Sequence, residues 1–238
     1  MEKYLVLDVE TAGNFSNPLC YDIGFKVIDA DGRVYDSASY VVKEIFDGEK
    51  YWYNNPTLME TAYYTKKLPQ YYAGLKTGAW KKANLLYIRK HIWNTIERNN
   101  VTAVCAYNAK FDVNALNQTI RYVTKSKIRD FFPSNLPIYD IWRMSCDSIC
   151  LTDDFLNTAY FEKWESECGN VRTSAEILWR YLSHNVNFEE SHTGLADVEI
   201  ECAILLECLK YSLEDFSITH FPWKIPQPPY HALKNEKF

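Results

Sequence analysis

Short apolar runs bounded by turn residues predict strands in the first part of the chain. Tyr4–Leu7 is an apolar run that ends at Asp8, which is typical of a buried strand. The segments 23–28 and 34–42 are also apolar, and the Gly-containing turn 29–32 between them predicts an antiparallel hairpin. Two further strands are expected at 101–107 and 137–141.

Helical periodicity marks the other regular segments. Apolar residues three or four positions apart predict one helix over about 80–98 and another over 112–123. Three more helices are expected around 154–167, 173–183 and 195–212. Three antiparallel strands followed by strands that alternate with helices predict an α/β fold with one mixed sheet flanked by helices.

Two segments depart from this order. Residues 43–80 form an irregular insertion that is rich in aromatic residues and lysines. We expect most of it to be a packed helical cap with a solvated basic face, and guidance of a single strand is the alternative. Residues 213–238 contain four prolines and predict an extended tail, packed on the domain rather than bound by a partner. The residues concerned in the insertion are Tyr51, Trp52, Tyr53, Tyr63, Tyr64, Tyr71, Tyr72, Trp80, Lys66, Lys67, Lys76, Lys81 and Lys82.

Composition narrows the classes of function. The chain has 238 residues and a formal charge of −5, from 26 Lys and Arg against 31 Asp and Glu. This balance argues against a protein that wraps duplex nucleic acid, because such affinity comes from neutralising many phosphates. It is compatible with an enzyme that touches a few nucleotides and holds cations with acidic side chains.

The cysteines and the N-terminus indicate a cytoplasmic protein. The seven cysteines contain no C-x-x-C pair, and Cys146 and Cys150 have no second ligand pair nearby, so free thiols are favoured over zinc. The four apolar residues before Asp8 are too few for a signal peptide. We also expect no membrane segment, since no run approaches the ~20 apolar residues of a span.

Three groups of polar residues are candidates for chemistry. Asp8 and Glu10 project from the same face of the first strand, and a divalent cation would relieve the repulsion between their carboxylates. Asp112 lies at a strand-to-helix junction, where sites in α/β sheets open, although a simple helix N-cap is the alternative. Gly194 suggests that the last helix begins there, which leaves His192 on a loop, free to act as a base, and Asp197 early in the helix.

Together, in this order, the three groups resemble the motifs of the DnaQ-like 3′→5′ exonucleases, the DEDDh branch of the ribonuclease H-like superfamily. The first motif reads LDVET over 7–11, the second NAKFD over 108–112, and the third is His192 with Asp197 five residues later. Weaker matches are Ile23-Gly24 and Tyr139-Asp140. The third motif departs from the common pattern, because Gly194 and Val198 replace small alanines. The resemblance covers residues 4 to about 209 and implies an exonuclease domain over 1–212.

The resemblance implies a mechanism that uses two Mg²⁺ or Mn²⁺ ions. The expected metal ligands are Asp8, Glu10, Asp112 and Asp197, with Asp8 bridging, and His192 is the expected general base. Water would attack the terminal phosphodiester in line and release a 5′-mononucleotide. The residues expected to bind substrate are Thr11, Ala12, Asn108 and Phe111, with stacking on bases expected of Phe111 and core packing as its alternative.

The leading hypothesis is therefore a metal-dependent 3′→5′ exonuclease that acts on single-stranded 3′ ends, with DNA favoured, in replication or repair. Within this class, an RNA-trimming enzyme and a proofreading subunit with a separate polymerase partner are alternatives. A nuclease fold that has lost catalysis and only binds nucleic acid is disfavoured, because all four acids and the histidine are present.

Overall fold

The computed structural model describes residues 1–14, 16–48, 58–167 and 169–211. Within them, one six-stranded mixed sheet has the order β4-β3-β2-β1-β5-β6. β1 to β3 are antiparallel, whereas β5 runs parallel to β1, β6 to β5 and β4 to β3. The predicted mixed α/β sheet is therefore confirmed. The strands are β1 (Lys3–Asn14), β2 (Asn17–Asp29), β3 (Val34–Val42), β4 (Lys82–Ala83), β5 (Ala103–Ala106) and β6 (Ile138–Asp140).

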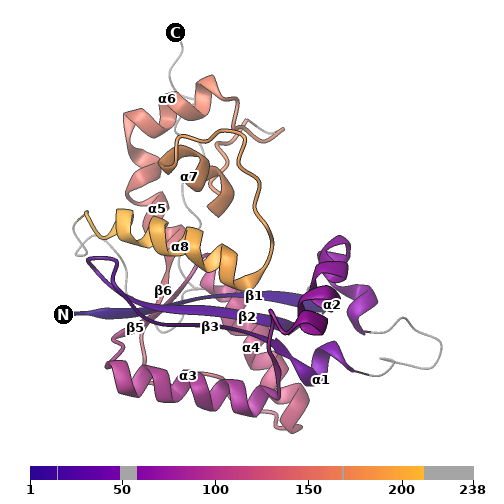
Figure 1. Ribbon diagram of the computed structural model, residues 1–238. Coiled ribbons are helices and arrows are strands. Elements are labelled where there is room, and N and C mark those ends of the chain that lie inside the picture. Colours follow the sequence, from indigo (N-terminus) through magenta and orange to yellow (C-terminus); the bar gives the residue numbers. More distant parts are fainter. Residues whose placement is uncertain (15, 49–57, 168, 212–238) are drawn as a thin grey trace.

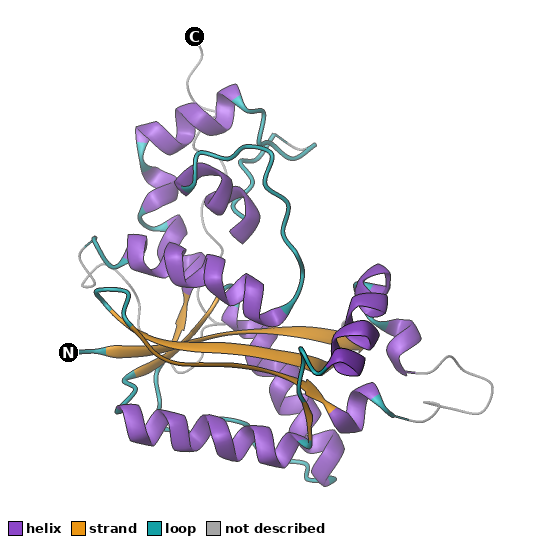
Figure 2. Cartoon of the chain, in the orientation of Figure 1, coloured by secondary structure: helices purple, strands orange, loops and turns teal. Residues whose placement is uncertain are grey.

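Helices cover both faces of the sheet (Figure 1). One face packs against α3 (Leu85–Asn99) and α4 (Ala109–Thr124), and the other against α8 (Gly194–Cys208) with α5 (Ile141–Cys146). Beyond α8 lie α6 (Asp153–Phe161) and α7 (Ala175–Leu182). In Figure 2 the loop from α7 to α8 runs down to the sheet, where α8 begins.

Alternation along β1 assigns its side chains to the two faces. Leu5 and Leu7 belong to the hydrophobic cluster that includes Leu116 of α4, whereas Tyr4 and Val6 belong to the cluster that includes Leu205 of α8. Successive side chains in a strand point to opposite faces. Residues 8 and 10, with the same parity as 4 and 6, are therefore directed toward α8.

Several predicted boundaries are wrong. β1 does not end before Asp8 but continues to Asn14. The helix predicted over about 80–98 is α3, which starts only at Leu85 because 82–83 form β4. α4 begins at Ala109, three residues earlier than predicted. The predicted helices at 154–167 and 195–212 end at Phe161 and Cys208, and α5 was not predicted.

The insertion is more regular than its sequence suggests. It contains α1 (Lys43–Phe46), two 3₁₀ turns, η1 (Leu58–Thr61) and η2 (Thr65–Lys67), and α2 (Leu68–Thr77). Tyr71 is fully buried, and Lys66, Lys76, Lys81 and Lys82 are exposed. Residues 51–53 and the predicted tail 213–238 lie outside the described residues.

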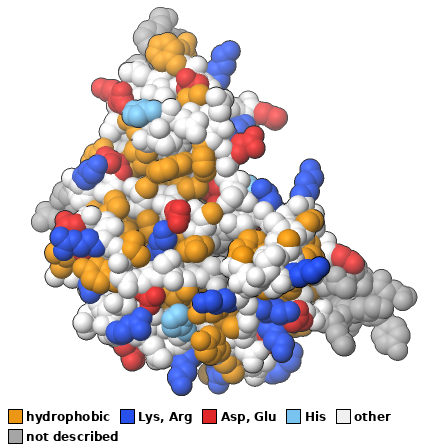
Figure 3. All heavy atoms as spheres, in the orientation of Figure 1, with side chains coloured by type: hydrophobic (Ala, Val, Ile, Leu, Met, Phe, Trp, Pro, Cys, Tyr) orange, Lys and Arg blue, Asp and Glu red, His pale blue; other side chains and the backbone are white. Residues whose placement is uncertain are grey.

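The distribution of charged side chains, the length of the helices and the state of the cysteines can be compared with the expectations from the sequence. On the face drawn in Figure 3, basic side chains are most frequent at the lower end, where Figure 1 draws α3. Across the described ranges, none of the helices is long and apolar enough to cross a bilayer. The six cysteines among those residues are buried free thiols, and Cys168 lies outside them.

Candidate active site

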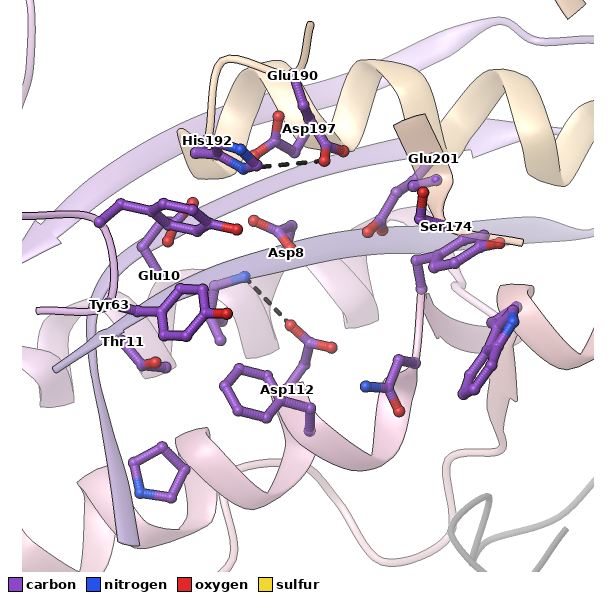
Figure 4. Close-up of a pocket in the computed structure, with 18 of the residues that line it drawn as sticks. Asp8, Glu10, Thr11, Tyr63, Asp112, Ser174, Glu190, His192, Asp197 and Glu201 are labelled. Carbon is purple, nitrogen blue, oxygen red and sulfur yellow. Dashed lines mark hydrogen bonds and ion pairs between the residues drawn. The ribbon is translucent and has the colours of Figure 1, made fainter. Parts of the chain in front are cut away.

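A pocket of about 750 Å³ opens where β1 meets the first turns of α4 and α8 (Figure 4). Its volume is in the range of small-molecule sites, and a nucleotide fits such a space. The structure brings every predicted site residue to this one pocket. These residues are Asp8, Glu10, Thr11, Ala12, Asn108, Phe111, Asp112, His192 and Asp197.

The pocket forms because β1 extends beyond the end of its parallel neighbour β5. Pairing between β1 and β5 ends at Val6, so the following part of β1 has no strand on that side among the described residues. The freed N–H of Val9 instead donates to Oδ1 of Asp112, at 3.3 Å. This bond fastens the first turn of α4 beside the segment that carries Asp8 and Glu10.

Asp112 lies inside the first turn of α4, and the N-cap position belongs to Asn108, in the left-handed region with φ 62°. The interpretation of Asp112 as a simple N-cap is therefore wrong. Its buried carboxylate lies near the positive end of the helix dipole, which favours negative charge. Burial nevertheless raises its pKa, and the Val9 N–H acts in the opposite direction.

Two glycines set the position of α8 against the sheet. Gly24 pairs with Asp8 across the β1–β2 ladder, and Gly194 lies directly on it. A Cβ at Gly24 would lie 2.2 Å from the carbonyl carbon of Gly194, and a Cβ at Gly194 would lie 2.7 Å from the Gly24 backbone nitrogen and 3.2 Å from the Asp8 carbonyl oxygen. Packing therefore explains why glycine, and not the alanine of the common third motif, stands at position 194. Asp197, one turn later, faces the β1 acids.

Buried Asp22 connects α8 to the insertion. Its Oδ2 accepts hydrogen bonds from the Gly194 N–H at 3.1 Å and from the Tyr71 hydroxyl at 2.6 Å. Its Oδ1 accepts a bond from the Ser39 hydroxyl at 3.2 Å. The start of α8, the sheet and α2 therefore meet at one carboxylate.

His192 lies on the loop before α8, as predicted, with φ 54°. The Tyr64 ring stacks on its imidazole, with centroids 3.9 Å apart and planes inclined by 11°. Burial and the nearby Lys67 charge lower the His192 pKa, which favours a neutral imidazole able to accept a proton. Nδ1 lies 3.8 Å from Oε2 of Glu190, which exceeds hydrogen-bond distance.

The electrostatics of the pocket favour a bound cation. Burial, followed by neighbouring carboxylates, raises the pKa of Glu10 to about 9 and that of Asp197 to about 8. Ligand atoms of Glu10, His192 and Asp197 lie within 4.8 Å of one another. Oδ1 of Asp197 is buried without a hydrogen-bond partner within the described ranges. A hard divalent cation suits these oxygen donors and would offset the repulsion among them.

The predicted substrate residues occupy the walls of the pocket. Thr11 and Ala12 are nearly buried, and the Thr11 carbonyl accepts a bond from the Tyr63 N–H at 3.0 Å. Asn108 is exposed, and its N–H donates to Asp140 at 3.2 Å. Phe111 is half-buried and belongs to neither hydrophobic cluster, so it is available to a ligand rather than packed in the core.

Other residues of the pocket were not predicted. Glu201 follows Asp197 by four residues, a helical spacing that could have revealed it, but the apolar neighbours in the helix indicated a core position. Glu190 and Tyr64 also line the pocket, and no pattern in the sequence distinguishes Tyr64 from the other insertion aromatics.

Comparison with solved structures identifies the fold. The chain aligns with E. coli Exonuclease I in complex with a dA16 oligonucleotide at TM-score 0.53 and 15% identity, over 91% of this chain. An ExoI/SSB-Ct complex aligns at TM-score 0.51 and 15% identity, over 90%. The fold is ribonuclease H-like, as predicted.

The ribonuclease H-like similarity has a limited extent. The chain spans 42% of the length of both Exonuclease I chains. No family model matches the sequence, and no curated protein matches it. The likeness therefore establishes the architecture, and the activity is inferred from the residues in the pocket.

Proposed function

We propose that the protein is a metal-dependent 3′→5′ exonuclease that removes 5′-mononucleotides from single-stranded nucleic acid, with DNA favoured. The observation that carries this proposal is the convergence of Asp8, Glu10, Asp112, His192 and Asp197 in one pocket. They come from β1, α4 and the start of α8, which lie apart in sequence. The solved relatives of the same fold include an exonuclease bound to a dA16 oligonucleotide, which supports the choice of substrate class.

The four carboxylates are the proposed ligands of two divalent cations, Mg²⁺ or Mn²⁺. Such cations supply charge neutralisation at the scissile phosphate and a more acidic water for attack. In Figure 4 Asp8 lies among Glu10, Asp112 and Asp197. Burial raises its pKa first, followed by the charges of Glu201 and of these three acids. This central place fits the bridging role proposed for it.

His192 is the proposed general base. Its lowered pKa leaves the imidazole neutral, and a neutral imidazole can take the proton of the attacking water. Tyr64 holds the ring by stacking, and the backbone of Thr11 and Ala12, with Phe111, provides walls for the terminal nucleotide. Stacking on Phe111 would be tolerant of sequence, because every base has a π-face.

The test uses purified full-length protein and 5′-labelled single-stranded DNA or RNA, with Mg²⁺, Mn²⁺ or EDTA. We expect a ladder that shortens from the 3′ end only when metal is present. Asp8→Asn should abolish shortening, whereas the exposed control Asp31→Asn should cleave like wild type. A phosphorothioate at the last 3′ linkage should block the reaction.

Two results would reject the proposal. Binding of the strand without cleavage in any metal would indicate a nucleic-acid-binding module. Cleavage that is unchanged in Asp8→Asn would show that the reaction occurs elsewhere. The ratio of rates on DNA and RNA tests the preferred sugar, and an RNA-only ladder would replace the DNA preference with RNA trimming.

A further inference from the structure

Helix α8 carries a second acid that is directed into the pocket. Glu201 lies one helical turn after Asp197, so the two side chains share a face of α8. Its side chain is only 3% exposed, yet it lines the pocket. In Figure 4 it extends from α8 toward Asp8 and Asp112.

Among the described residues, the main charges acting on the Glu201 carboxyl are all negative. Its Oε2 has no hydrogen-bond partner within the described part of the chain. The Tyr107 N–H is the favourable contact of this carboxyl, and the neighbouring charges of Asp112, Asp197 and Glu190 all oppose its ionisation. A buried carboxylate with one unpartnered oxygen is costly, so side chains of this kind are rare in cores.

Glu201 and the group Glu10, His192 and Asp197 lie on different sides of the pocket (Figure 4). Glu10, His192 and Asp197 converge on one side. In Figure 4 Glu201 lies on the other side of Asp8, away from these three residues. An oxygen donor aimed at this point can complete the coordination of a hard cation that needs about six oxygen ligands.

We propose that Glu201 is an additional ligand, direct or through one water, for a divalent cation on the Asp8–Asp112 side of the pocket. This assignment rests on the proposed function, since it adds a donor to that metal site. A carboxylate at this position raises the affinity of the second cation site by contributing a negative charge and an oxygen, Oε2, that has no hydrogen-bond partner among the described residues.

The test measures Mn²⁺ alone binding to the full chain, by electron paramagnetic resonance of free Mn²⁺ and by calorimetry. We expect two Mn²⁺ ions per wild-type chain and at least a tenfold weaker second equilibrium in Glu201→Gln. Glu199→Gln is the matched control: Glu199 lies on the same helix but is 63% exposed and pairs with Lys26 at 2.8 Å. Its binding curve should coincide with that of wild type.

The outcomes separate this inference from the proposed function. If Glu201→Gln binds two Mn²⁺ ions like wild type, the assignment is wrong while the nuclease proposal stands. If wild type binds no Mn²⁺, both fail. Should the Gln variant not fold, Glu201→Met fills a similar space among the apolar neighbours without a charge or an oxygen donor, and wild-type Mn²⁺ affinity in that variant would equally overturn the assignment.

Discussion

Asp197→Asn should stabilise the metal-free protein, because it removes a buried negative charge that lies close to other carboxylates. The Asp197 side chain is 5% exposed and its Oδ1 has no hydrogen-bond partner in the described residues. Asparagine has nearly the same shape and stays neutral at every pH. The substitution therefore isolates the electrostatic cost of the carboxylate from its packing.

The magnitude follows from the pKa of Asp197, which is raised from 3.8 to about 8, first by burial and then by Glu190. One pKa unit corresponds to about 1.36 kcal/mol, so full ionisation carries a ceiling of about 5–6 kcal/mol. Water in the pocket and local relaxation lower this cost, and we expect a gain of roughly 1–3 kcal/mol at pH 8. For a chain of this size that is about 3–10 °C in Tm.

The effect of Asp197→Asn on stability depends on pH. A carboxyl whose folded pKa is raised stabilises the fold below its unfolded pKa, and this stability is lost as the pH rises toward the folded value. For Asp197 the loss extends from about pH 4 to about pH 8, so the advantage of Asn grows over the same interval. Added Mn²⁺ should reverse the order, because a ligand that binds the folded state stabilises the chain that binds it better.

Thermal melts in EDTA at pH 5, 6.5 and 8 measure this effect, with Asp31→Asn as the control because Asp31 is exposed on the β2–β3 turn. A Tm that falls in Asp197→Asn at pH 8 would refute the electrostatic account. So would a gain that is the same at pH 5 and pH 8. A gain in EDTA that persists unchanged in Mn²⁺ would instead refute Asp197 as a metal ligand.

Two further predictions concern packing around the site. Gly24→Ala should lower the Tm by several degrees at least, since its Cβ would lie 2.2 Å from Gly194, and an unchanged melt would contradict the close contact. Tyr64→Ala should lower kcat roughly 5- to 30-fold with little change in KM, because it frees the His192 ring, whereas Tyr64→Phe retains the stack and the rate. Equal losses in the Ala and Phe variants would indicate that the hydroxyl, and not stacking, matters.

Much of the fold could be predicted because local pattern and burial agree. The strand at 34–42 is observed as β3 with the same bounds, and the apolar spacing found α3, although the predicted helix began before Leu85, in the segment that forms β4. β1 was cut short at Asp8 because acids interrupt the apolar pattern. Asp8 and Glu10 nevertheless lie within β1, where their side chains face the pocket instead of the apolar core. A single sequence cannot show which polar positions of a strand face a cavity.

The candidate site was likewise predicted only in part from the sequence. Motif spacing found the residues at the ends of local elements, including His192 on a loop that stops where Gly194 begins α8. Glu201 escaped because an acid among apolar helical residues carries no motif. Tyr64 escaped because its role depends on a contact with a residue 128 positions away, which local pattern does not contain.

The insertion takes part in the site through contacts rather than through a motif. Tyr71 of α2 and the first N–H of α8 share one carboxylate oxygen of Asp22, and the Tyr64 ring covers His192. A shift of α2 would therefore disturb the start of α8, and a shift of the η2 turn that precedes it would disturb the stack on the imidazole. Since the position of α8 also fixes Asp197 opposite β1, contacts with the insertion position both the proposed base and a proposed metal ligand. The insertion and the site consequently form one unit.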